Sequence, residues 1–388
     1  MKRTFKWAGL SLVGLMLSPV ALAQENTLEL PKVLAWSAYD VGSAGYNQAV
    51  AIGNAFRQKY GVSIRVLPGK NDVSRNLPLR EGQVSFSVNG VGGVFFAQEG
   101  MYEFGSRAWG PQPVRNLMLN SVQSALSAMT AGDIGVKTPV DLKGKRVAWI
   151  IGAPALNQNM TATLAFGGLT WDDVEKVEFG GYGAAWDGIV ANQADSVFGS
   201  SIAGKAYALE KSNRGITYPV MDPEDKEGWA RVQAVGSYFY PLYATEGAGL
   251  SAENGVHSSA YPYPILMTYA DRDASLVSKV TNAMIDTFDM YKDAAPGADG
   301  WALDKQRLEW VVPLHEGAVN VFKDKGMWTD DLQQNQENLV KRQEVLEAAW
   351  KDVNSRQHDS DDAFQEDWMK TRADALKAAG MDPILERW

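Results

Sequence analysis

Short extended segments alternate with helical ones along most of the chain, and this order constrains the fold more than any other feature. Four segments in the first part of the chain have the composition of strands: residues 32–36, 63–67, 84–88 and 117–120. Between the first two, Ala49, Ile52, Gly53 and Phe56 follow helical spacing and place small and apolar side chains on one face. A strand–helix–strand order predicts a parallel-type sheet with helices on its faces.

A second series of strands follows the first, at residues 146–151, 177–179, 196–198 and 217–220. Residues 264–269 have the pattern of a strand that returns to the first sheet. Because 388 residues usually form more than one core, we expect a bilobed α/β fold, of the type II-like periplasmic binding-protein kind, with hinge strands between the lobes. The predicted boundaries are residues 24–126 and 259–330 for lobe 1, 127–258 for lobe 2, and 331–388 for a helical extension packed on lobe 1.

The first 23 residues have the pattern of a secretory signal peptide. Lys2, Arg3 and Lys6 precede an apolar run at residues 8–20, and Ala21-Leu22-Ala23 has the small residues of a cleavage site. The apolar run falls short of the roughly 20 residues needed to span a bilayer. We therefore expect cleavage after Ala23 and a periplasmic protein that does not itself span the membrane. The chain has no Cys, which excludes disulfides and thiolate metal sites.

Charge and motifs argue against several functional classes. The formal net charge is −9, which gives no basic surface for a nucleic acid. The three histidines, His257, His315 and His358, lie in no HExxH arrangement, and Gly199-Ser200-Ser201-Ile202-Ala203 fails the GxSxG pattern at its last position. No phosphate-binding loop is complete. The sequence therefore predicts no enzyme activity, no cofactor and no metal site, and we expect a monomer.

The stretch Gly42-Ser43-Ala44-Gly45 joins the first strand to the first helix. Glycines allow a tight turn there and leave the first N–H groups of the helix free, a geometry that binds anions. Ser43 has two interpretations, as the N-cap of the helix or as a ligand contact. This stretch alone does not decide between them.

Five segments together resemble the TAXI-type solute receptors of TRAP transporters. They are the Gly42–Gly45 turn and residues 71–90, 141–149, 171–198 and 313–328, in the family's order and spacing. The similarity covers roughly residues 30–330. It implies a receptor that binds a small carboxylate between two lobes, such as a dicarboxylate, a 2-oxo acid or a glutamate-like amino acid, and delivers it to a TRAP-type membrane permease. The alternatives are an ABC-type substrate-binding protein and a secreted α/β enzyme or sensor subunit.

Candidate ligand contacts follow from the turn, from the resemblance and from the carboxyl ends of the predicted strands, where α/β folds bind ligands. The full set is Tyr39, Ser43, Ala44, Tyr46, Asn71, Asp72, Arg75, Asn89, Asn157, Gln158, Tyr182 and Trp186. Arg75 is either a bidentate clamp for a carboxylate or a solvated surface residue. For Asp72 we favour a role as N-cap of the second helix. Residues 261–264 precede the returning strand, and we expect them near a hinge.

Overall fold

The computed structural model describes Met1 and residues 28–388, so the predicted signal peptide lies outside the described residues apart from Met1. Lobe 1 is built on a five-stranded sheet with the order β2-β1-β3-β12-β4. Its strands are β1 (Val33–Tyr39), β2 (Ser63–Gly69), β3 (Phe86–Asn89), β4 (Val114–Leu119) and β12 (Ile265–Tyr269). Strand β12 runs antiparallel to both of its neighbours, whereas β1 is parallel to β2 and β3.

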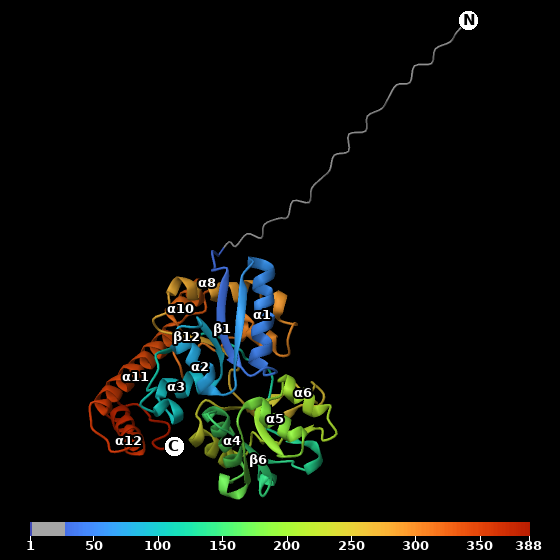
Figure 1. Ribbon diagram of the computed structural model, residues 1–388, viewed down its shortest axis with the longest axis vertical. Helices are drawn as coiled ribbons and strands as arrows, with labels where there is room; N and C mark the ends of the chain where they lie inside the picture. Colours follow the sequence, from blue (N-terminus) through green and yellow to red (C-terminus); the bar gives the residue numbers. More distant parts are fainter. Residues whose placement is uncertain (2–27) are drawn as a thin grey trace.

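Lobe 2 repeats this plan in a second five-stranded sheet with the order β7-β6-β8-β5-β9. Its strands are β5 (Leu126–Ala131), β6 (Arg146–Ile150), β7 (Glu175–Phe179), β8 (Ser196–Ser200) and β9 (Ile216–Thr217). Here β5 is the antiparallel strand beside β8, and β6 is parallel to β7 and β8. The predicted bilobed α/β class is confirmed, and Figure 1 shows one lobe above the other.

Helices cover both faces of each sheet, and the inner strands β3, β12, β5 and β8 are buried along their whole length. In lobe 1, α1, α8 and α10 share one hydrophobic core with β1, β3 and β4, while α2 and the π-helix η1 pack on the other face. In lobe 2, α5 and α6 cover one face, and α4 and α7 cover the other. The bounds of the helices in the two lobes are α1 (Ala44–Tyr60), α2 (Asp72–Arg80), η1 (Gly92–Phe96), α4 (Pro154–Phe166), α5 (Tyr182–Val190), α6 (Gly204–Glu210), α7 (Lys226–Val235), α8 (Ala274–Asp286), α9 (Phe288–Tyr291) and α10 (Glu316–Asp324).

Local sequence explains where α1 begins and ends. The Ser43 side chain accepts a hydrogen bond from the Tyr46 N–H, at an Oγ–N distance of 3.2 Å, and so caps the helix. Gly42, with φ of 86°, supplies the left-handed turn that brings the chain from β1 into the helix. The predicted apolar face, which includes Ile52 and Phe56, is fully buried.

Two short segments carry the chain between the lobes. Residues 120–125 join β4 to β5. Strands β10 (Tyr240–Ala244) and β11 (Val256–Ala260) form a hairpin, and residues 261–264 lead from this hairpin to β12. The segments are hydrogen-bonded to each other, because the Asn120 N–H donates to the Pro264 carbonyl at 2.9 Å and the Tyr263 N–H donates to the Asn120 carbonyl at 2.8 Å. We propose that these two segments form the hinge between the lobes.

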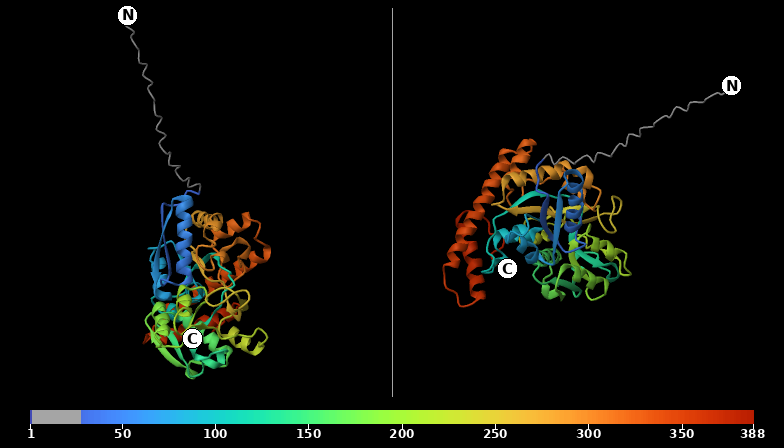
Figure 2. Two further views of the ribbon diagram at one scale, coloured as in Figure 1. Left: turned by 90° about the vertical axis from the view of Figure 1, so that its right-hand side faces the viewer. Right: turned by 45° about the horizontal axis from the view of Figure 1, so that its top comes forward.

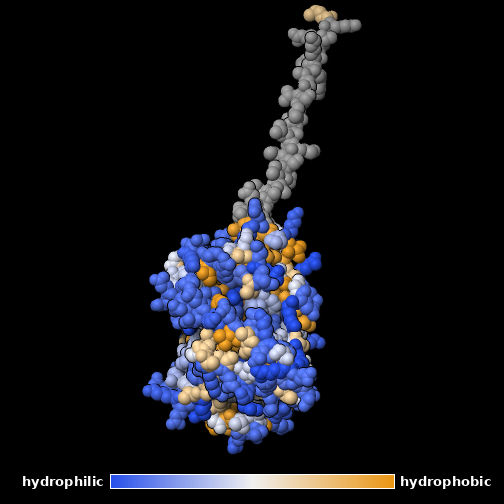
Figure 3. Space-filling view, turned by 90° about the vertical axis from the view of Figure 1, so that its left-hand side faces the viewer, coloured by the Kyte–Doolittle hydropathy of each residue, from blue (hydrophilic) through white to orange (hydrophobic). Residues whose placement is uncertain are grey.

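The C-terminal helices α11 (Asp330–Asn354) and α12 (Asp361–Ala378) pack against each other and against the segment that begins with α3 (Ala97–Glu99) in lobe 1. Figures 1 and 2 show them as a pair along one side of the molecule. The fully buried Glu99 accepts hydrogen bonds from Arg342 of α11 and Arg372 of α12, with N–O distances of 2.6–2.8 Å. One buried carboxylate therefore ties both helices to lobe 1. The surface on this side of the molecule is mostly hydrophilic, as Figure 3 shows.

Replacing Glu99 tests this tie. Glu99→Gln leaves two buried guanidinium groups without a countercharge, so we expect a loss of about 3 to 5 kcal/mol in the free energy of unfolding. Urea denaturation measures it, and hydrogen exchange should show loss of protection in α11 and α12. The matched control is Asp374→Asn, which breaks an exposed ion pair with Lys370 on α12 and should leave the free energy of unfolding nearly unchanged. Equal losses of stability in Glu99→Gln and Asp374→Asn would show that Glu99 does not hold α11 and α12 to lobe 1.

Candidate functional site

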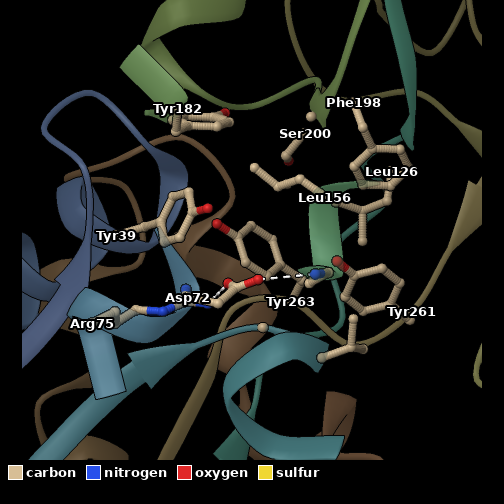
Figure 4. A pocket seen from close by; sticks show the side chains of 14 residues that line it. Tyr39, Asp72, Arg75, Leu126, Leu156, Tyr182, Phe198, Ser200, Tyr261 and Tyr263 are labelled. Carbon is tan, nitrogen blue, oxygen red and sulfur yellow. Dashed lines mark hydrogen bonds and ion pairs between the residues drawn. The ribbon is translucent and has the colours of Figure 1, made fainter. Parts of the chain in front are cut away.

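A cavity lies between the lobes, at the edge where the carboxyl ends of β1, β3 and β8 meet. Its lining comes from both lobes and from the second crossover segment (Figure 4): Tyr39, Asp72, Arg75, Gly90, Val91, Leu126, Ala155, Leu156, Tyr182, Phe198, Gly199, Ser200, Tyr261 and Tyr263. The cavity volume is about 30 Å³, room for one or two water molecules. Small-molecule sites usually enclose several hundred Å³, so the cavity is too small for most ligands in this arrangement of the lobes.

Asp72 connects the two lobes across this cavity. The N-cap of α2 is Asn71, whose side chain accepts from the Ser74 N–H, so the prediction of Asp72 as N-cap is wrong by one residue. The Asp72 side chain is instead buried, with 1% of its surface exposed. Its Oδ1 accepts from Arg75 Nη2 at 2.7 Å, and its Oδ2 accepts from the Ala155 N–H of lobe 2 at 2.9 Å.

The Ala155 contact places the Asp72 carboxylate at the N-terminus of α4. That helix begins with Pro154, and its N-cap Ala153 has no side chain that could satisfy the first N–H groups. Burial raises the pKa of Asp72, while Arg75 and the Ala155 N–H oppose that rise. The Asp72 carboxylate thus lies at a helix N-terminus, where the free backbone N–H groups and the helix dipole favour a negative charge.

Arg75 is the cation that lines the cavity. Its guanidinium lies 4.3 Å from the centre of the Tyr39 ring, a stacking contact, and only 3% of the residue is exposed. Within the part of the chain that the structure describes, the buried Nε of Arg75 has no hydrogen-bond partner. The interpretation of Arg75 as a solvated surface residue is therefore wrong. An unpaired guanidinium N–H beside a cavity can donate to a ligand.

Four tyrosines surround the cavity, and Figure 4 shows Tyr39, Tyr182, Tyr261 and Tyr263 around Asp72. Burial raises the pKa of each of these hydroxyls, so all four stay protonated at neutral pH and can donate. The Tyr261 hydroxyl accepts a hydrogen bond from Asn159 Nδ2 at 3.1 Å.

Two hydroxyl groups on opposite lobes lack partners. The buried Tyr39 hydroxyl of lobe 1 and the buried Ser200 hydroxyl of lobe 2 have no hydrogen-bond partner among the described residues. A buried hydroxyl without a partner costs roughly 1 to 3 kcal/mol. Together with Arg75 Nε, three polar atoms of the lining residues are therefore buried without a partner, a pattern that favours a polar ligand.

Further contacts hold the lobes together beside the cavity. The Asp40 carboxylate of lobe 1 accepts from the Gly183 N–H of α5 at 3.2 Å, and the Tyr182 N–H donates to the Lys70 carbonyl at the same distance. Gly92 permits close approach, because a Cβ there would lie 2.6 Å from Asp72 and 2.7 Å from Ala155. Two carboxylates of lobe 1 thus each meet the N-terminus of a lobe 2 helix.

The structure brings four of the predicted contacts, Tyr39, Asp72, Arg75 and Tyr182, together around the cavity. Four others make structural contacts. Asn89 hydrogen-bonds Asn76 and Ser87, Asn157 hydrogen-bonds the backbone of Ile150, Gln158 donates to the Val235 carbonyl, and Trp186 is buried in the lobe 2 core. Their contact with a ligand stays a prediction.

The remaining four predicted residues lie at the start of α1 and α2, outside the cavity lining. Ser43 caps α1, Ala44 packs against Tyr263, Tyr46 is half-buried, and the Asn71 side chain donates to the Ile151 carbonyl of lobe 2 at 3.3 Å.

Sequence reasoning missed several lining residues of lobe 2. Phe198 and Ser200 lie at the carboxyl end of β8, the position that the strand-end rule indicates, and could have been found by applying it there. Leu126 begins β5, a strand that the sequence analysis did not predict. Tyr261 and Tyr263 lie in the stretch expected near a hinge, and the structure adds them to the cavity wall.

The described residues contain no group of three or more His, Cys, Asp or Glu side chains arranged to hold a metal ion. None of the helices within the described ranges is both long enough and apolar enough to cross a bilayer.

Adjacent serines provide a test of the unsatisfied hydroxyls. Ser200→Ala removes a hydroxyl without a partner, so we expect the ligand-free protein to gain up to about 1 kcal/mol in the free energy of unfolding. Ser201 instead donates to the Glu246 carbonyl and accepts from the Ala125 N–H, so Ser201→Ala should destabilise the protein. Urea denaturation compares the two. A loss of stability in Ser200→Ala as large as that in Ser201→Ala would show that Ser200 is a structural residue.

Comparisons with known structures give distant similarities. One is the substrate-binding protein of an amino acid ABC transporter, with 14% identity over 69% of this chain and 98% of that chain and a TM-score of 0.41. Another is the alkanesulfonate-binding protein SsuA from Xanthomonas axonopodis pv. citri bound to MOPS, with 14% identity over 78% and 96% and a TM-score of 0.40. An ancestral arginine-binding protein bound to arginine has 13% identity over 70% and 96%, also at 0.40.

A comparison with curated proteins finds no match. A protein-family model, described as the NMT1-like family, matches residues 40–326. This range contains the two crossover segments, every strand of both sheets except β1, and every residue that lines the cavity except Tyr39. The chain belongs to the NMT1-like family.

Proposed function

We propose that this protein is a solute-binding protein that holds a small carboxylate between its two lobes. The observation that carries the proposal is the interlobe cavity, which is lined by buried Arg75 with an unpaired Nε and by Tyr39 and Ser200, whose hydroxyls also lack partners. A guanidinium and protonated hydroxyls are suitable donors for a carboxylate, and charge-assisted hydrogen bonds of this kind are among the stronger ones in proteins. We propose no catalysis, because the described wall of the cavity pairs no nucleophile with a general base.

The biological setting is part of the same proposal. The resemblance of five segments to TAXI-type receptors supports delivery of the ligand to a TRAP-type membrane permease, and the N-terminal 23 residues support export to the periplasm. The protein would act there as a monomer, without a nucleic acid partner. Opening about the segments 120–125 and 261–264 would admit the ligand, and closing would surround it.

Substitution of Arg75 tests the carboxylate contact. The ligand is first identified by a thermal-shift screen of carboxylates on protein that has been unfolded, freed of bound compounds and refolded. Arg75→Ala should then weaken its binding by about 2 to 5 kcal/mol in calorimetry, because the ligand loses its charged partner. Arg75→Lys should lose part of the affinity, since it keeps the charge without the planar fork.

The control for these variants is Arg80→Lys on the same helix. Arg80 stacks on Trp109 and lies outside the cavity lining, so its substitution should leave affinity unchanged. Circular dichroism establishes that each variant is folded. Wild-type affinity in folded Arg75→Ala would reduce Arg75 to a structural partner of Asp72 and remove the main support for a carboxylate ligand.

We further propose that the carboxylate reaches the Gly42–Gly45 turn and touches Ser43 and the neighbouring backbone N–H groups. Calorimetry on Ser43→Ala tests this part separately, and weaker binding is expected. If Ser43→Ala binds like wild type while Arg75→Ala does not, the carboxylate lies at Arg75 alone. Wild-type binding in both Ser43→Ala and Arg75→Ala would place the ligand carboxylate elsewhere.

A further inference from the structure

The charge of the cavity wall limits which carboxylates it accepts. Among the described lining residues, the charged side chains are Asp72 and Arg75, and they already form an ion pair with an N–O distance of 2.7 Å. The wall is therefore neutral overall. A ligand with one carboxylate adds one negative charge beside Arg75, whereas a dicarboxylate adds two, next to the Asp72 carboxylate and without a further cation in the lining.

A second carboxylate would be costly in this environment. Asp72 and Arg75 are 1% and 3% exposed, so charges there are poorly screened by water. The cost of burying a charge without a partner is large, and the described lining contains no cation besides Arg75. The described wall thus favours a single carboxylate.

The rest of the wall is suited to an apolar group. Besides the four tyrosine rings, lobe 2 contributes Leu126, Leu156, Ala155 and Phe198, and lobe 1 contributes Val91. Figure 4 shows Leu126, Leu156 and Phe198 next to Ser200, away from Arg75. Apolar walls with a few placed polar groups are typical of sites that bind a ligand with a polar head and an apolar body.

We propose that the ligand is a monocarboxylate whose remaining part is apolar or aromatic, and that Asp72 is the residue that discriminates against dicarboxylates. This inference rests on the proposed function, because it takes the interlobe cavity as a carboxylate site. Arg75 Nε and the Tyr39 hydroxyl bind the carboxylate, and the apolar body lies against Phe198, Leu126 and Leu156. The Asp72 carboxylate repels any second anionic group.

The test uses ligands that share one head group. Calorimetry on refolded wild-type protein compares 4-methyl-2-oxopentanoate and phenylpyruvate with 2-oxoglutarate, which carries a second carboxylate in place of the apolar end. At least one of the first two should bind ten-fold or more tightly than 2-oxoglutarate. Choline is included as a probe for a cation bound by the tyrosine rings, and we expect it not to bind.

Asp72→Asn tests the discriminating residue. The substitution removes one negative charge at nearly constant shape, so the preference for the monocarboxylates over 2-oxoglutarate should fall at least three-fold. The matched control is Asp40→Asn, which alters the other carboxylate that joins the lobes but lies outside the cavity lining. Asp40→Asn should keep the wild-type ratio of the affinity for the monocarboxylates to the affinity for 2-oxoglutarate, even if all affinities change.

The outcomes separate this inference from the proposed function. Tighter binding of 2-oxoglutarate than of either monocarboxylate in wild-type protein would overturn the inference and leave a carboxylate receptor. An unchanged ratio in folded Asp72→Asn would remove the role of Asp72. Binding of choline with no binding of carboxylates would overturn both proposals. If Asp72→Asn does not fold, the wild-type ratios still decide the ligand class.

Discussion

The Asp72 carboxylate is the interaction on which the closed arrangement of the lobes depends most. One oxygen pairs with Arg75 on the same helix, and the other accepts an N–H at the start of α4 in the opposite lobe. A buried carboxylate is stable only with such partners, so the position of Asp72 is tied to the approach of lobe 2. Gly92 has no side chain to block that approach. The cavity lies beside this contact, since Asp72, Arg75 and Ala155 are all part of its lining.

The topology explains why the contact forms at this place. Both sheets have the same strand order, and each contains one antiparallel strand, β12 or β5, that follows a crossover between lobes. The crossovers are hydrogen-bonded together, which keeps the carboxyl edges of the two sheets facing each other. The first turns of α2, α4 and α5 then meet across the gap. The C-terminal helices are held to lobe 1 by a separate buried carboxylate, Glu99.

Much of this fold could be predicted from the sequence, because most strands of the two sheets are short apolar segments between helical ones. Strand β5 was not predicted: its sequence, LSAMTA, has no alternation of apolar and polar residues, and all six residues are buried between strands distant in sequence. The hairpin β10–β11 was also missed, since Pro241 lies inside its first strand.

For the site, sequence reasoning selected Tyr39, Asp72, Arg75 and Tyr182 because they lie near strand ends and helix starts. It could not establish that Arg75 is buried, which depends on Asp72 and on the Tyr39 ring. Nor could it distinguish Asn71 from Asp72 as the N-cap, because both side chains suit that position. Ser200 differs from Ser201 only through tertiary contacts that no local pattern encodes.

The most direct test of the account is a crystal structure of the refolded protein with the monocarboxylate that binds it most tightly. The account predicts the carboxylate between the lobes, within hydrogen-bond distance of Arg75 Nε and the Tyr39 hydroxyl, and the apolar body against Phe198 and Leu126. A ligand bound outside the interlobe cavity, with Arg75 Nε still unpaired, would contradict it.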